Sequence, residues 1–295
     1  MKILVTGSNG QLGSELKEIS GDFPEWHFIF TDVDDLDITD EKSVDAFFRK
    51  NKPSFIVNCA AYTAVDKSES DMQAAHQINA VGPGVLAMAS KKHDVNLIHI
   101  STDYVYDGQN YKPYEEFDPV NPASVYGKTK LAGERLIRSA NPDTVIIRTA
   151  WLYSSFGNNF VKTMLRLGSE KDSLKVVFDQ IGTPTYAYDL AQAILEVIAN
   201  SNNNPSNSLS GIYHYSNDGV ASWYDFAVTI FEITGLHCKV LPVLTSEFPT
   251  PAKRPHYSVL NKSKIKTTFN IEIPYWKDSL KLCIEKIQKT NEYGK

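Results

Sequence analysis

A tyrosine and a lysine four residues apart, Tyr126 and Lys130, have the side chains needed for acid–base chemistry. On a helix, positions i and i+4 share one face, so the two side chains would project together. An ammonium group beside a phenol lowers the phenol pKa and makes it a usable proton donor near neutral pH. With 15 tyrosines in the chain, about one such pair is expected by chance, and an exposed helical pair is the alternative.

Three glycines near the start of the chain provide the context that the pair needs. Gly7, Gly10 and Gly13 directly follow an apolar run and open an amphipathic stretch. Such glycines allow a tight turn, let a pyrophosphate approach backbone N–H groups at a helix N-terminus, and let the helix pack closely on the strand. We therefore predict a dinucleotide site, rather than a plain turn, with these contacts: Gly7, Gly10, Gln11, Leu12 and Gly13.

Asp32 ends the next apolar run, about 20 residues after the glycines. An acidic side chain at this position accepts hydrogen bonds from the adenosine ribose hydroxyls and repels a 2′-phosphate. Lys17 is the only Lys or Arg between Ser8 and Asp40. The segment therefore predicts that NADH serves at least as well as NADPH, and a solvated acidic turn over 32–37 is the alternative.

The elements that must position these residues alternate over the first 150 residues. Short apolar runs are followed by longer helical patterns, which is typical of βαβ units and a parallel sheet. We predict an α/β, doubly wound parallel-sheet Rossmann fold over 1–150 that also receives about 186–215. A smaller C-terminal α/β substrate-binding domain is expected mainly within 151–295, with interleaved boundaries. The predicted strands are 2–6, 27–31, 55–58, 96–100 and 144–148, and the predicted helices are 11–20, 40–51, 69–93 and 125–139.

Composition excludes several other classes of protein. The 295 residues carry 30 Lys+Arg against 35 Asp+Glu, a net charge of −5, so binding of nucleic acid or anionic membranes by bulk charge is not expected. Three cysteines without a Cys-x-x-Cys pair form neither a disulfide framework nor a zinc ribbon. No apolar stretch approaches the ~18 residues that span a bilayer. We expect a cytoplasmic protein.

Longer motifs reveal a resemblance to a known family. Besides the glycines and the Tyr126/Lys130 pair, they are Asn58-Cys-Ala-Ala-Tyr-Thr-Ala-Val-Asp66, Ser101-Thr-Asp-Tyr-Val-Tyr-Asp-Gly108, Arg148-Thr-Ala-Trp-Leu-Tyr153 and Phe178-Asp-Gln-Ile-Gly-Thr-Pro-Thr185. Together they resemble the extended short-chain dehydrogenase/reductases and, more narrowly, the dTDP-4-dehydrorhamnose reductases. Related 4,6-dehydratases carry an acidic pair after the active-site threonine, whereas here Tyr104 follows Asp103, which favours net reduction.

The resemblance implies a reaction and a role for individual residues. The implied reaction is hydride transfer from NADPH or NADH to the C4 ketone of a dTDP-6-deoxy-4-ketohexose. Tyr126 would donate the proton, Lys130 would bond the nicotinamide ribose, and Thr102 would hold the carbonyl oxygen. Further contacts are implied with the cofactor (Asp37, Ile38, Ala61, Tyr62, Thr63) and with the substrate (Val65, Thr102, Asp103, Tyr104, Trp151, Arg254).

Alternatives remain for several of these residues. Asp103 either contacts substrate or caps its loop, Trp151 is alternatively a core residue, and Arg254 either meets the diphosphate bidentately or forms a surface ion pair.

Other functions also remain open. One is reduction or epimerisation of another nucleotide sugar, and another is a non-catalytic subunit related to the regulator of a methionine adenosyltransferase. The histidines show no paired ligand spacing, so no metal is expected. Some relatives bridge a dimer through glutamates and Mg²⁺. Glu15 lies in the corresponding helix, but segment 186–189 offers no second glutamate, and a homodimer stays one alternative.

Overall fold

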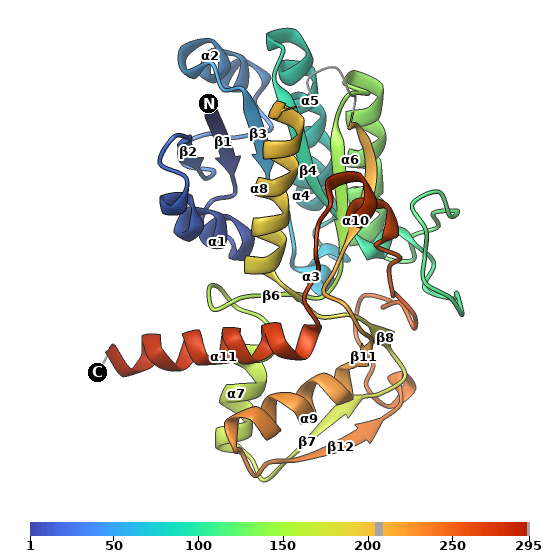
Figure 1. The fold of residues 1–295 in the computed structure, drawn as a ribbon. Coiled ribbons are helices and arrows are strands. Elements are labelled where there is room, and N and C mark those ends of the chain that lie inside the picture. The colour runs from blue at the N-terminus through green and yellow to red at the C-terminus, as the bar shows by residue number, and fades with distance from the viewer. Residues whose placement is uncertain (204–208, 294–295) are drawn as a thin grey trace.

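A six-stranded parallel sheet forms the centre of the larger lobe of the molecule (Figure 1). The computed structural model describes residues 1–203 and 209–293. The strand order is β10-β5-β4-β3-β1-β2, and every pairing in this sheet is parallel. The strands are β1 (Lys2–Thr6), β2 (His27–Thr31), β3 (Phe55–Asn58), β4 (Asn96–Thr102), β5 (Val145–Thr149) and β10 (Gly211–Tyr215). The predicted Rossmann-type α/β fold is confirmed.

Helices cover both faces of the sheet because neighbouring strand residues point to opposite sides. Ile3 and Val5 pack with the helices of one face, whereas Leu4 packs with those of the other. The first face carries α1 (Gln11–Ile19), α8 (Ala187–Asn203) and α10 (Ser263–Phe269), and the second carries α2 (Glu41–Asn51), α5 (Gly82–His93) and α6 (Val125–Ala140). α8 and β10, both within segment 186–215, lie in this lobe, and the domain division itself stays a prediction.

The predicted helix over 69–93 is divided into several pieces. The chain forms α3 (Val65–Ser68), α4 (Met72–His76), a π-helical turn (Gln77–Val81) and then α5. Pro83 lies in the first turn of α5 and has no N–H to donate to the Asn79 carbonyl, which favours a wider turn. A Cβ atom at Gly133 of α6 would lie 2.1 Å from this carbonyl oxygen. The absence of a side chain at Gly133 therefore permits α6 to pack closely against the π-helical turn.

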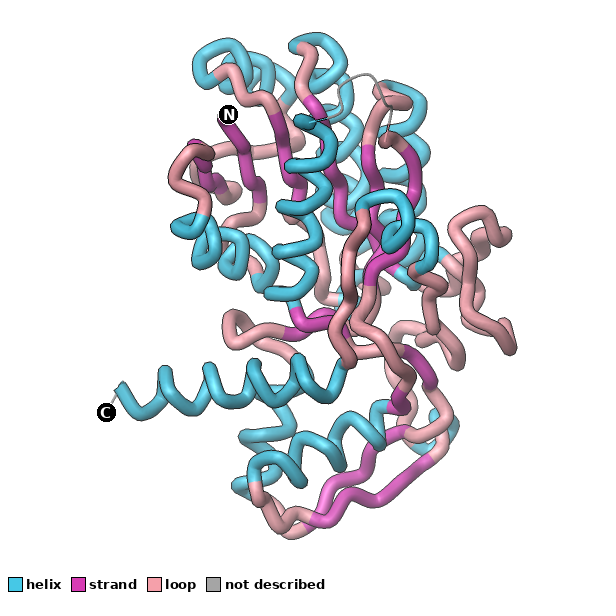
Figure 2. The backbone as a smooth tube through the Cα atoms, viewed as in Figure 1, coloured by secondary structure: helices cyan, strands magenta, loops and turns pink. Residues whose placement is uncertain are grey.

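The smaller lobe is built mainly from the second half of the chain (Figure 1), and Figure 2 shows its helices beside a pair of strands. Its core lies between two amphipathic helices, the parallel pair β7–β12 and the last helix. These elements are α7 (Phe160–Glu170), β7 (Ser173–Val177), α9 (Trp223–Thr234), β12 (Lys239–Val243) and α11 (Trp276–Tyr293). Two short pairs lie between the lobes: β6 (Leu152–Tyr153) with β9 (Thr185–Tyr186), and β8 (Ile181–Gly182) with β11 (Ala221–Ser222). A domain boundary at residue 150 stays a prediction.

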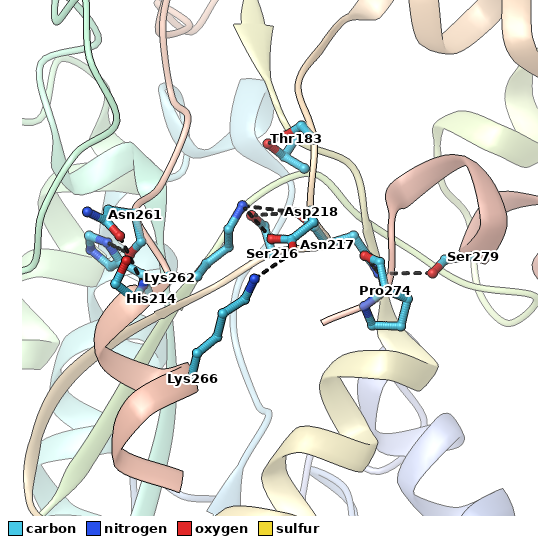
Figure 3. A network of polar contacts seen from close by, with 12 residues as sticks. Thr183, His214, Ser216, Asn217, Asp218, Asn261, Lys262, Lys266, Pro274 and Ser279 are labelled. Carbon is cyan, nitrogen blue, oxygen red and sulfur yellow. Dashed lines mark hydrogen bonds and ion pairs between the residues drawn. The ribbon is translucent and has the colours of Figure 1, made fainter. Parts of the chain in front are cut away.

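A polar network around Asn217 holds the chain where it passes between the lobes (Figure 3). The Asn217 amide donates to Asp189 Oδ2 at 2.6 Å, to Ser279 Oγ at 2.9 Å and to the Pro274 carbonyl at 3.2 Å. Its oxygen accepts from the backbone N–H of Tyr186 at 2.8 Å. Because Asn217 is fully buried, these bonds tie the starts of α8 and α11 to the end of β10.

Two further predictions concern the ends of helices and the membrane. The Asn-, Ser- and Pro-rich composition of residues 201–210 predicts an exposed loop. Instead, α8 continues to Asn203, and the Ser201 hydroxyl donates to the Val197 carbonyl within the helix at 2.8 Å. Residues 204–208 of that prediction lie outside the described residues.

Within the ranges 1–203 and 209–293, no helix combines the length and the apolar character that a membrane span requires.

Candidate active site

A cleft of about 830 Å³ opens at the carboxyl ends of the central strands. Gly7 follows β1, Asp32 follows β2, Cys59 follows β3, and Thr102 ends β4, and all four line the cleft. Trp223 at the start of α9 lines it from the smaller lobe. The cleft therefore lies where open α/β sheets hold their ligands, with the smaller lobe as its other wall.

The turn after β1 has the backbone geometry of an anion cradle. Gly7 has φ +64°, and a Cβ atom there would lie 2.6 Å from the Ala60 nitrogen. A Cβ atom at Gly13 would lie 2.5 Å from the Gly7 carbonyl oxygen, so α1 packs against the turn only because residue 13 is glycine. Gly10 is the N-cap of α1, and the first N–H groups of a helix have no partner within it. These groups fit a diphosphate.

The carboxylates of the acidic turn after β2 accept hydrogen bonds from within the turn and from the glycine turn. Asp32 accepts hydrogen bonds from the Asn9 N–H at 3.0 Å and from the Val33 N–H at 2.8 Å. Asp37 accepts at 2.8 Å from both the N–H and the hydroxyl of Thr39. Ile38 is buried, and all three predicted residues line the cleft. The structure thus places them together, with the Asp32 carboxylate tied to the glycine turn.

Tyr126 and Lys130 lie on consecutive turns of α6 and both line the cleft. The helix begins close to the loop after β4, because a Cβ atom at Gly127 would lie 2.2 Å from the Tyr104 carbonyl oxygen. The Ser124 hydroxyl caps the helix by accepting from the Gly127 N–H. Lys130 is only 2% exposed, and its Nζ donates to the Ile100 carbonyl at 2.6 Å.

The predicted lowering of the Tyr126 pKa by Lys130 is wrong for the protein alone. Burial raises the pKa of Tyr126 to about 12, although a hydrogen bond with Thr102 opposes this rise. The Lys130 ammonium is directed to the Ile100 carbonyl, and burial lowers the pKa of Lys130 to about 8. Tyr126 therefore holds its proton at neutral pH, as a proton donor must.

The loop after β4 brings a hydroxyl and a carboxyl group to the same place. Thr102 Oγ1 donates to Asp103 Oδ1 at 2.9 Å and accepts from the Tyr104 N–H at 3.2 Å. Burial raises the pKa of Asp103 to about 6, against hydrogen bonds from Ser258 and Thr102 that lower it. The rings of Tyr104 and Tyr126 meet edge to face at 5.4 Å. Thr102 thus contacts both the phenol of Tyr126 and the carboxyl of Asp103, whose pKa burial has raised.

Two tryptophans stack at the wall facing the smaller lobe. The Trp151 and Trp223 rings lie 3.7 Å apart and are tilted by 9°. Trp151 has φ +48°, a conformation that side chains other than glycine rarely adopt and that packing must enforce. Trp223 was not predicted, because it lies 72 positions away in sequence and no motif marks it.

Other lining residues also escaped the sequence analysis. Asn159 caps α7, and its amide donates to Gln11 Oε1 at 2.9 Å, which links the two lobes across the cleft. Thr149 could have been found from its place at the end of β5. Val65, Ala61 and Thr63 also line the cleft.

Two predicted residues are not part of the cleft wall. The Tyr62 phenol donates to Asp71 Oδ2 at 3.0 Å, and its backbone is bonded to Asn79. Arg254 forms a bidentate ion pair with Asp66, at 3.0 and 2.7 Å. The ion pair is the alternative that the sequence left open for Arg254.

Glu15 is engaged within the protein. Its carboxylate accepts from Ser154 Oγ at 2.5 Å and from Lys286 Nζ at 2.9 Å. In the ranges 1–203 and 209–293, no group of three or more His, Cys, Asp or Glu side chains is placed to hold a metal ion.

Comparison with known proteins gives consistent matches over nearly the whole chain. The RmlD substrate binding domain family matches residues 1–289. A dTDP-4-dehydrorhamnose reductase of Aggregatibacter actinomycetemcomitans is 40% identical over 287 residues, which cover 95% of this chain and 97% of the relative. The spore coat polysaccharide biosynthesis protein SpsK of Bacillus subtilis is 41% identical over 281 residues, 95% of each chain.

Solved structures match equally well. The crystal structure of a dTDP-4-dehydrorhamnose reductase from Clostridium acetobutylicum has a TM-score of 0.92 and 50% identity, covering 98% of this chain and 100% of the other. That of the Bacillus anthracis dTDP-4-dehydrorhamnose reductase in complex with NADP has a TM-score of 0.90 and 39% identity, covering 97% of this chain and 99% of the other.

Proposed function

Because this chain belongs to the RmlD substrate binding domain family, we propose that its cleft reduces the C4 ketone of dTDP-4-dehydro-6-deoxy-L-mannose. The product is dTDP-L-rhamnose, and NADPH or NADH is the hydride donor. The single observation that supports this most is the meeting of Tyr126, Lys130 and Thr102 beside the glycine turn, in one cleft. The cofactor supplies the hydride. The side chains of the protein bind, orient and supply the proton.

Each residue has a role that follows from its contacts. Tyr126, protonated at neutral pH, donates its proton to the forming alkoxide. The Thr102 hydroxyl holds the carbonyl oxygen while negative charge develops there. Lys130 bonds the nicotinamide ribose and stabilises the phenolate that Tyr126 leaves behind. The second lobe supplies Trp223, which supports Trp151 against the sugar.

The proposed cofactor contacts are those that line the cleft at the turns after β1, β2 and β3. The N–H groups at the start of α1 hold the diphosphate, and the carboxylate of Asp32 accepts from the adenosine ribose. We propose that Tyr62 shapes this site through its backbone, since its phenol is directed to Asp71. The role of Arg254 at the nucleotide diphosphate stays a prediction, as does a cytoplasmic location.

Turnover with the purified protein tests the proposal. Oxidation of NADPH and of NADH is followed at 340 nm with dTDP-4-dehydro-6-deoxy-L-mannose as the substrate, and kcat/KM is compared for the two cofactors. We expect turnover with both. If neither cofactor is oxidised although cofactor binding is intact, the proposed reductase activity is contradicted and a non-catalytic role is favoured. A strong preference for NADPH would contradict the interpretation of Asp32.

Tyr126→Phe tests the proton donor. The substitution should lower kcat by about 10²–10⁴-fold while leaving the cofactor Kd unchanged, because only the proton source is lost. Tyr111→Phe is the matched control, since Tyr111 is 90% exposed and lies outside the cleft. Normal turnover by Tyr126→Phe would show that another group donates the proton.

A further inference from the structure

A row of buried polar side chains crosses the sheet directly behind Lys130. Thr6, Asn58 and His99 are register partners on the neighbouring strands β1, β3 and β4. They are 1%, 1% and 0% exposed, so solvent cannot satisfy their hydrogen bonds. The row ends at Lys130, whose Nζ lies 3.4 Å from His99 Nε2. The proposed reaction uses Lys130 but leaves the rest of the row without a role.

The orientation of the Asn58 amide follows from its neighbours. The backbone N–H of Ala60 lies 3.1 Å from Asn58 Oδ1 and can only donate. The Thr6 hydroxyl contacts the same atom at 2.8 Å. The oxygen of the amide is therefore on this side, and its NH₂ group is directed at His99 Nδ1, at 3.0 Å.

The tautomer of His99 follows in turn. Because Nδ1 receives a hydrogen bond from Asn58, this nitrogen is unprotonated. Burial lowers the pKa of His99 well below its ordinary value, so the ring is neutral. A neutral imidazole has one proton, which must then be on Nε2, the nitrogen that faces Lys130.

The two charge states of Lys130 meet this N–H differently. An amine uses its lone pair to accept from His99 Nε2–H and still donates to the Ile100 carbonyl. An ammonium group has no lone pair, so the donor Lys130 Nζ would face the donor His99 Nε2–H, with the two nitrogens 3.4 Å apart. We propose that His99, held by Asn58 in its Nε2–H tautomer, is a positioning residue that favours the uncharged form of Lys130 over the ammonium.

The other charged groups around Lys130 do not produce this effect. Glu134, on the same helix, and Cys59, after β3, both raise its pKa, while burial lowers it. The negative charge of Glu134 is balanced by its ion pair with Arg148. Tyr126 is protonated and brings no charge. His99 is thus the neutral neighbour that can present either an N–H or a lone pair to Lys130, depending on which ring nitrogen holds its proton.

The tautomer can be measured directly in the unaltered protein. With ¹⁵N-labelled histidine, the chemical shifts of the two ring nitrogens distinguish a protonated from an unprotonated one, and the His99 signals are identified by their loss in His99→Gln. We expect a protonated Nε2 and an unprotonated Nδ1 between pH 6 and 9. A protonated Nδ1 would overturn the proposal. This experiment needs no substrate, so its result does not depend on the proposed reductase activity. The role of His99 in the reaction does rest on that proposed activity.

Asn58→Asp tests the consequence for Lys130. A carboxylate keeps the acceptor for Ala60 and Thr6 but offers a second oxygen to His99, which moves the ring proton to Nδ1 and leaves Nε2 to accept from the ammonium. The pKa of Lys130, followed through its ¹³Cε signal, should rise by about one unit or more. The decline of kcat at high pH should move upward by the same amount, because the charged form of Lys130 serves the reaction.

Thr6→Val is the matched control for this variant. It removes one buried hydrogen bond to Asn58 but leaves the Ala60 N–H, and therefore the orientation of the amide, unchanged. It should lower stability without moving the pKa of Lys130. An unchanged or lowered pKa in Asn58→Asp would overturn the proposal, and so would an equal rise in Thr6→Val. An equal rise when Asn58→Asp is made in the His99→Gln background, where the added negative charge acts with no ring proton to move, would also overturn it.

Discussion

The buried ion pair between Glu134 and Arg148 gives the sharpest test of how α6 is held on the sheet. Arg148 Nε lies 2.9 Å from Glu134 Oε1, and Nη2 lies 2.6 Å from Oε2. The two side chains are 3% and 2% exposed. Arg148 also donates to Tyr106, and Glu134 accepts from Ser101. Glu134 is one turn beyond Lys130, so this pair fixes the helix that carries the proposed proton donor.

Glu134→Gln removes the negative charge and keeps the shape of the side chain. The Arg148 guanidinium then remains buried without a counter-charge, which costs about 3–5 kcal/mol. The entropy of unfolding is about 2.1 cal/mol/K per residue, so for 295 residues this loss corresponds to a decrease in Tm of about 5–8 °C. The measurement is calorimetric unfolding at pH 7.

Two further variants make this result interpretable. The double variant Glu134→Leu/Arg148→Met removes both charges and should unfold within a few degrees of the natural protein, because no buried charge is left alone. Glu170→Gln breaks an exposed pair with Arg166, where the side chains are 52% and 60% exposed, and should cost under about 0.5 kcal/mol. A double variant as unstable as Glu134→Gln would refute the reasoning.

Three more predictions concern the cleft. Burial raises the pKa of Asp103 to about 6, so its ionisation in the folded protein costs stability as pH rises from about 4 through 6. The difference in unfolding free energy between Asp103→Asn and the natural protein should therefore shift in favour of the variant by up to about 3 kcal/mol from pH 4 to pH 8, as measured by urea unfolding. A difference that does not change with pH would contradict this. Trp223→Ala should raise the KM for the nucleotide sugar about tenfold and leave the cofactor KM unchanged, because Trp151 loses the ring that supports it. Val33 is 67% exposed beside Asp32 at the cleft, so Val33→Arg should raise the NADPH/NADH ratio of kcat/KM about tenfold, and an unchanged ratio would place the 2′-hydroxyl elsewhere.

Local pattern was enough to predict most of the larger lobe. The strands at 2–6, 27–31 and 55–58 agree with the structure residue for residue, because continuous apolar runs bounded by turns have few alternatives in a parallel sheet. The glycine turn was predictable for a similar reason, since a positive φ at Gly7 and a close approach at Gly13 exclude other residues. The Gly82-Pro83-Gly84 sequence also predicts a break in the helix over 69–93, but that the break takes the form of a π turn was not predictable from it.

Within the cleft, the sequence by itself determined which residues follow the central strands, and the parallel topology brings those positions to one edge. Tertiary structure alone decided the partners from distant segments: Trp223 against Trp151, Asn159 against Gln11, and Asp66 against Arg254. It also reversed one electrostatic expectation. Spacing alone predicted a lowered Tyr126 pKa, but the free energy of a charge depends on burial and on the direction of each hydrogen bond, and these exist only once the chain has folded.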